Sequence, residues 1–119
     1  MADYRKWFVR LTAVAVLLSV LVVLLGAYTR LAEAGLGCPD WPGCYGQIMV
    51  PQGEKAVQQA VAAYPEIPLE SAKAWKEMVH RYAAGSLGML IFVLSGLAWR
   101  RRKTLGKGAL YLPLALVVL

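Results

Sequence analysis

Four residues combine chemical type and spacing in a way that could support chemistry. Cys38 and Cys44 are the only cysteines of the chain, and His80 is its only histidine. Glu77 precedes His80 by three positions. Since residues three apart project from one face of a helix, a helix here would place a carboxylate beside an imidazole.

More than one interpretation of the Glu77–His80 pair is open. A neutral imidazole that faces the interior of a membrane bundle is a common ligand of haem iron. Alternatively, His80 and Arg81 simply occupy a membrane interface, where both side chains are tolerated. Glu77 could orient the imidazole, relay a proton or complete an exposed surface pair. Spacing alone does not choose between these roles.

Two long apolar runs must position these residues. Of the 119 residues, 59% are hydrophobic, against roughly 45–50% in soluble globular proteins. The run 11–29 holds no charged residue, and the run 77–99 carries its ionisable groups only at its start. Each run reaches the ~20 residues needed to cross a bilayer. We therefore predict an all-α integral membrane protein, a transmembrane helical bundle with two full spans in this chain.

The two ends of the sequence add detail to this prediction. Residues 108–119 form another apolar run, which we expect to be the start of a third span. A cleaved signal peptide is the alternative for the first run, because its start is basic and its middle apolar. Its length and the poor cleavage site at 26–30 favour a retained anchor instead.

The basic residues indicate how the chain is oriented in the membrane. The formal net charge is +6, and the segments 1–10 and 100–107 hold eight of the 13 Lys and Arg residues but only one acid, Asp3. The positive-inside rule places both segments in the cytoplasm. This distribution argues against nucleic acid as a partner. It predicts a multi-pass protein of the cytoplasmic (inner) membrane, with a cytoplasmic N-terminus and an extracytoplasmic loop at 30–76.

The 30–76 loop holds both cysteines on the oxidising side of that membrane, where a disulfide can form and persist. Free thiols or a metal-bound pair are the alternative, although a zinc site normally needs four ligands. The C-x5-C spacing also differs from that of thiol oxidoreductases. Within the loop, residues 54–64 are expected to form a short amphipathic helix. Its apolar face would consist of Val57, Ala60, Val61 and Tyr64.

Three stretches of the sequence resemble haem A synthases. They are Gly-Ala-Tyr-Thr-Arg-Leu at 26–31, the cysteine-containing stretch 35–46 and the Glu-x-x-His-Arg motif at 77–81. Haem A synthases are polytopic enzymes that oxidise a ring methyl of haem O to a formyl group, which gives haem A for cytochrome oxidase. The resemblance covers the first two spans and the loop between them. It implies that the chain is the amino-terminal part of such an oxidoreductase.

The resemblance also implies roles for individual residues. His80 would be an axial ligand of the haem iron, with haem O as the substrate. Glu77 would be the catalytic carboxylate near that haem. Cys38 and Cys44 would be the paired loop cysteines, which are capable of forming a disulfide. The complete enzyme would use haem b as a cofactor.

Arg30 and Arg81 are predicted to bind the haem propionates, because a guanidinium holds a carboxylate in a bidentate fork. Members of the family have further spans and further haem-associated histidines, whereas this chain has one histidine. We therefore expect the isolated chain to be inactive. Its partners besides the bilayer would be the remaining helices of the same enzyme, another subunit or a second copy in a homo-oligomer. The alternative function is a non-enzymatic haem-binding or oxidase-assembly membrane subunit.

Overall fold

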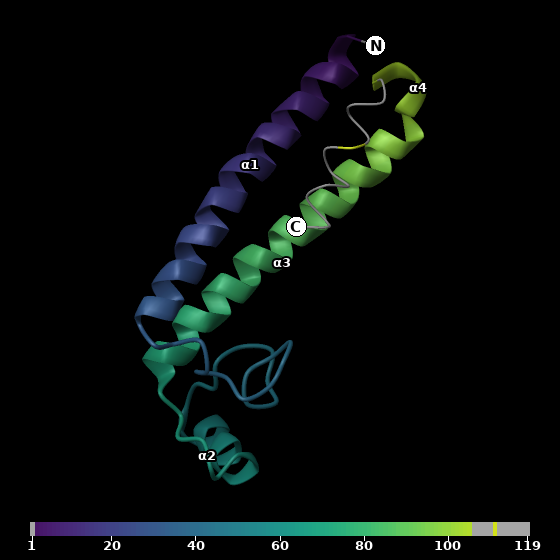
Figure 1. Ribbon diagram of the computed structural model, residues 1–119. Helices are drawn as coiled ribbons and strands as arrows, with labels where there is room; N and C mark the ends of the chain where they lie inside the picture. The colour runs from purple at the N-terminus through teal and green to yellow at the C-terminus, as the bar shows by residue number, and fades with distance from the viewer. Residues whose placement is uncertain (1, 106–110, 112–119) are drawn as a thin grey trace. The chain divides into compact units, whose positions relative to one another are not determined.

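The computed structural model describes residues 2–105 and residue 111, and it is helical throughout its regular elements. The helices are α1 (Ala2–Leu31), α2 (Glu54–Ala63), α3 (Ser71–Arg100) and the short α4 (Arg102–Leu105) (Figure 1). No β-strand occurs in the described part of the chain. The predicted all-α class is confirmed. The predicted start of a third span at 108–119 lies outside the described residues, apart from Tyr111.

Helices α1 and α3 match the two predicted spans. Each has 30 residues and is long and apolar enough to cross a bilayer. Many of their large apolar side chains are exposed, such as Leu17 and Phe92, at 71% and 76%. A large number of such side chains on one helix surface indicates a face that lipid or another protein covers. The exposure therefore agrees with two helices that span a membrane.

The chain divides into two compact units, and each contains part of both long helices. Among the described residues, the first unit contains 2–21 and 83–105. There the hydroxyl of Tyr4 donates a hydrogen bond to the carbonyl of Leu97 at 3.2 Å. The guanidinium of Arg101 lies 5.1 Å from the ring centroid of Tyr4. In this unit the beginning of α1 therefore packs against the end of α3.

The second unit, residues 22–82, contains the loop, α2 and the adjoining ends of α1 and α3. Its core brings loop residues together with one face of α2 and the first turns of α3. The buried members are Cys38, Cys44, Tyr45, Val50, Ala60, Ala74 and Met78. From α2, Ala60 is 1% exposed but Val61 is 49% exposed. The small loop core therefore contacts only a narrow strip of the predicted apolar face of α2.

Tyr45 links the loop to the segment that leads into α3. Its hydroxyl lies 3.2 Å from the carbonyl oxygen of Pro68, to which it donates, and its ring meets that of Tyr64 edge to face at 5.6 Å. Burial raises the pKa of the Tyr45 phenol, and the negative charges of Asp40 and Glu70 raise it further. The folded chain thus keeps this proton at a pH where the unfolded chain loses it.

This shift predicts a loss of stability at alkaline pH. The stability that Tyr45 contributes is fully present below its unfolded pKa of about 10 and is lost as the pH rises through the higher folded value. We expect the unfolding temperature to fall as the pH passes about 10. In Tyr45→Phe this dependence should be weaker. Thermal unfolding followed by circular dichroism over a pH series checks this, and identical pH profiles for both proteins would disprove it.

Candidate functional site

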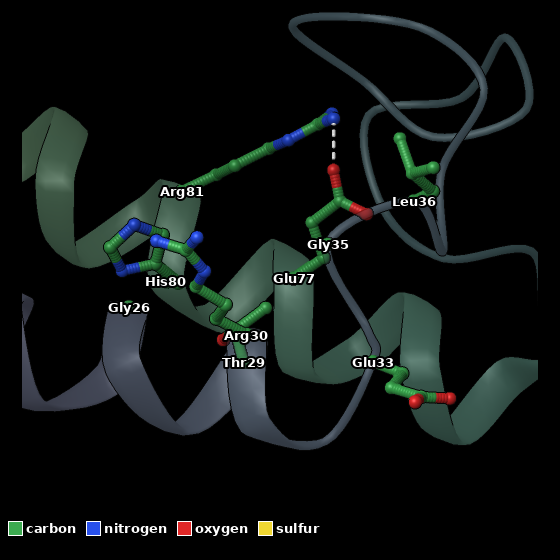
Figure 2. Close-up of a pocket in the computed structure, with 9 residues that line it drawn as sticks. All are labelled: Gly26, Thr29, Arg30, Glu33, Gly35, Leu36, Glu77, His80 and Arg81. Atoms are coloured by element: carbon green, nitrogen blue, oxygen red, sulfur yellow. Dashed lines mark hydrogen bonds and ion pairs between the residues drawn. The ribbon is translucent and has the colours of Figure 1, made fainter.

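A pocket of about 500 Å³ lies in the second unit, between the end of α1, the start of the loop and the beginning of α3 (Figure 2). Its volume falls within the roughly 300–1,000 Å³ typical of small-molecule sites. The pocket brings together all four non-cysteine residues that the sequence nominated. Its lining consists of Gly26, Thr29, Arg30, Glu33, Gly35, Leu36, Glu77, His80 and Arg81.

His80 is the most unusual residue of this pocket. Its Nδ1 atom is buried and has no hydrogen-bond partner among the described residues. A buried polar atom without a partner costs free energy, so such atoms are rare in folded proteins. The described chain also contains no cluster of three or more His, Cys, Asp or Glu side chains that could hold a metal ion. The pocket therefore offers a single imidazole as a donor.

Glu77 is buried, and both of its carboxylate oxygens accept hydrogen bonds. Oε2 accepts from the backbone N–H of Cys38 at 3.0 Å, and Oε1 accepts from Nη2 of Arg81 in a short ion pair (Figure 2). Charge-assisted hydrogen bonds of this kind are stronger than neutral ones. Glu77 thus lines the pocket and at the same time holds the loop at Cys38.

Arg81 extends this connection to the other side of the cysteine loop. Its Nη1 atom donates to the carbonyl oxygens of Asp40 and Gly43, each at 2.7 Å. Together with Glu77, it attaches α3 to the loop at three backbone positions. The sequence predicts that Arg81 binds a haem propionate. In the structure its terminal nitrogens donate to the loop and to Glu77, and propionate binding by Arg81 stays a prediction.

Arg30 is the other predicted propionate ligand, and it is placed differently. Its side chain is exposed at the pocket. It has no hydrogen-bond or ion-pair partner in the part of the chain that the structure describes. An arginine side chain in this situation is available to an anionic group that enters the pocket. The two arginines therefore differ: Arg81 holds the loop, whereas the guanidinium of Arg30 is available to a ligand.

The predicted disulfide is present between Cys38 and Cys44, with an S–S distance of 2.14 Å. Two features close the turn between them. The Asp40 carboxylate accepts hydrogen bonds from the backbone N–H groups of Tyr45 and Gly46. A Cβ atom at Gly43 would lie 2.2 Å from the carbonyl oxygen of Gln47, so this position requires glycine. The loop is therefore shaped by close backbone contacts as well as by the disulfide.

Sequence reasoning missed two residues of α1 that line the pocket. Thr29 is buried, and its hydroxyl donates to the Leu25 carbonyl at 2.8 Å and lies 3.4 Å from that of Lys76 on α3. Gly26 lies against the imidazole of His80. The two residues are three positions apart, a spacing that indicates one face of α1. That periodicity was the signal that could have identified them.

Comparison with known proteins gives a consistent result. Residues 9–119 match the sequence model of the COX15-CtaA family, described as cytochrome oxidase assembly protein. The chain is 52% identical to a haem A synthase of Shewanella oneidensis over 88 residues, which cover 74% of this chain and 26% of that protein.

More distant relatives extend the comparison. The chain is 31% identical to haem A synthases of Lysinibacillus sphaericus and Shouchella clausii, with 82% and 83% of this chain covered. Those matches span 26% and 28% of the two relatives, so the chain covers about a quarter of the length of the curated relatives it matches. No solved structure matches the chain.

Proposed function

Because this chain belongs to the COX15-CtaA family of cytochrome oxidase assembly proteins, we propose that it forms the amino-terminal part of a haem A synthase. The complete enzyme would oxidise a ring methyl of haem O to the formyl group of haem A, with haem b as a cofactor. The observation that carries the proposal is the lone imidazole of His80, whose Nδ1 is buried without a partner in the pocket.

The donor set of the pocket fits haem better than it fits a free metal ion. A protein site for a bare ion such as zinc needs three or four ligands. Porphyrin nitrogens already surround the iron of haem, so the protein needs to add only an axial ligand. One histidine, without other clustered ligands in the described residues, satisfies that smaller requirement. His80 would hold the iron of the substrate haem O in this way.

The remaining pocket residues would bind and shield the substrate. Arg30 would receive a haem propionate, since its guanidinium has no other partner in the described chain. Arg81 and Glu77 would hold the cysteine loop against α3, beside the pocket. We predict a second role for Glu77, in oxidation of the methyl group. Its carboxylate lines the same pocket as His80, which supports this prediction.

Haem supplies the redox chemistry when it is bound, whereas the protein supplies ligation, orientation and proton handling. We also propose that the N-terminus is cytoplasmic, that the 30–76 loop is extracytoplasmic and that the disulfide persists there. The membrane would be the inner membrane. The rest of the site would come from helices outside this chain, since the chain covers about a quarter of its relatives.

One prediction concerns Arg30. Replacing it with glutamine should weaken haem binding by roughly 10- to 100-fold, because a hydrogen bond to a charged group contributes about 1.5–3 kcal/mol. Arg30→Lys should retain part of the affinity, because lysine keeps the charge but loses the bidentate geometry. Haem titration of the purified protein measures both variants. Equal affinities for Arg30→Gln and the unmodified protein would disprove a propionate contact at Arg30.

The proposed function itself is tested by expressing the complete protein in cells that make haem O but no haem A. Extracted pigments are then separated by chromatography. Accumulation of haem A would support the proposal. If haem O copurifies with the protein but no haem A forms, the non-enzymatic haem-binding subunit becomes the better description.

A further inference from the structure

Gly26 occupies the interior of helix α1 directly opposite the imidazole of His80. A glycine inside a helix is destabilising relative to alanine, because it loses more backbone freedom on folding. Its presence here therefore calls for a reason. A Cβ atom built at Gly26 would lie 2.9 Å from Cε1 and 3.3 Å from Nε2 of His80. Figure 2 shows the imidazole ring lying over α1 at this position.

The close approach is specific to Gly26 among the helical glycines of the described chain. At Gly85, Gly88 and Gly96, all in α3, an added Cβ atom would meet nothing within 4 Å. Those positions could accept alanine without a collision. At Gly26 the same change would place carbon inside the contact distance of the ring.

We propose that Gly26 is a positioning residue for His80. Because Gly26 has no side chain, the Cε1 edge of the imidazole can lie close to α1. This inference rests on the proposed function, in which His80 ligates haem iron. The contact fixes the direction in which the ring presents its nitrogens to the pocket. It also explains how the half-buried imidazole can keep one orientation although its buried Nδ1 atom has no hydrogen-bond partner in the described residues.

A larger residue at position 26 would act on the imidazole more than on the fold. The ring stands at the end of a rotatable side chain, whereas a shift of the α1 backbone would also disturb the approach of the Thr29 hydroxyl to the Lys76 carbonyl on α3. Rotation of the ring away from its present rotamer is therefore the least costly response to a new methyl group. The expected effect is a change in haem ligation with little change in unfolding.

The experiment compares two glycine-to-alanine variants of the complete protein in detergent micelles. Residues that orient a metal ligand typically affect metal affinity by about 10- to 100-fold. We expect Gly26→Ala to weaken haem binding by that factor and to shift the absorption spectrum and midpoint potential of the bound haem. The matched control Gly96→Ala should change none of these. Unchanged affinity, spectrum and potential in Gly26→Ala would overturn the inference.

A second measurement examines the contact without haem. Nuclear magnetic resonance of the haem-free protein should show a nuclear Overhauser contact between the His80 ring and the Hα protons of Gly26, with the ring signal assigned by its loss in His80→Gln. The contact should persist in Gly96→Ala. If the unmodified protein shows no such contact, the inference is overturned. If His80→Gln binds haem normally, the proposed function fails, whereas the measured ring contact still reports on Gly26 independently.

Discussion

Replacement of His80 by alanine is expected to abolish haem A production by the complete protein, with haem O remaining in its place. The imidazole is the single side chain lining the described pocket whose nitrogen could ligate iron, and its Nδ1 is already buried without a partner. Loss of residues that merely orient a ligand costs roughly 10- to 100-fold in metal affinity. Loss of the ligand itself should exceed that range. Chromatography of extracted haems measures the ratio of haem A to haem O.

The adjacent residue provides the control for this variant. Val79 lies on the same turn of α3 but is 45% exposed and does not line the pocket. Val79→Ala should therefore leave the haem ratio near that of the unmodified protein. Equal production of haem A by His80→Ala and Val79→Ala would refute the assignment of His80 as a ligand.

Replacement of Glu77 by alanine is expected to destabilise the attachment of the loop to α3. It leaves the Cys38 N–H and the Arg81 guanidinium without their carboxylate partner, in a region where the Glu77 and Arg81 side chains are only 9% and 18% exposed. An unsatisfied buried polar group costs about 1–3 kcal/mol, and more when it is charged. We expect a lower unfolding temperature and a large loss of haem A production. Calorimetry and pigment extraction measure these two effects.

Glu77→Gln separates the structural role of this residue from a catalytic one. Glutamine keeps a carbonyl oxygen that can accept one of the two hydrogen bonds, so much of the stability should return. If the carboxylate takes part directly in methyl oxidation, the glutamine variant should fold and bind haem O but form little haem A. If Glu77→Gln recovers both stability and haem A production, the role of Glu77 is limited to holding the loop on α3.

Glu70 is the matched control for the loss of a carboxylate. Its ion pair with Lys73 spans 3.1 Å, but the two side chains are 56% and 35% exposed. Exposed pairs of this kind contribute about 0–1 kcal/mol. The unfolding temperature of Glu70→Ala should consequently be close to that of the unmodified protein. If Glu70→Ala lost as much stability as Glu77→Ala, the buried contacts of Glu77 with Cys38 and Arg81 would contribute no more to stability than an exposed ion pair.

The spans and the local pairing of residues were predictable because they depend on nearby sequence. Hydrophobic runs of sufficient length identify membrane helices whatever surrounds them. The three-residue spacing of Glu77 and His80 determines a common helix face without tertiary information. The cysteine pair is also local, since only six positions separate its members. Each of these predictions agrees with the structure.

The role of Arg81 and the contact at Gly26 were not predictable in the same way. Arg81 donates to Asp40 and Gly43, about forty positions earlier in the chain. Gly26 meets a ring on a different helix. Such contacts depend on the path of the loop and on how α1 and α3 pack within the second unit. A charge pattern cannot distinguish an arginine that holds a loop from one that is available to a ligand, as Arg30 is.

The most direct test is the ligand-field spectrum of the haem bound by the purified complete protein, recorded by electron paramagnetic resonance and optical absorption. The account predicts a histidine-ligated signal from substrate haem in the unmodified protein and in Val79→Ala. The same signal should be missing from His80→Ala. An identical histidine-ligated signal in His80→Ala would contradict the claim that this pocket holds haem through His80.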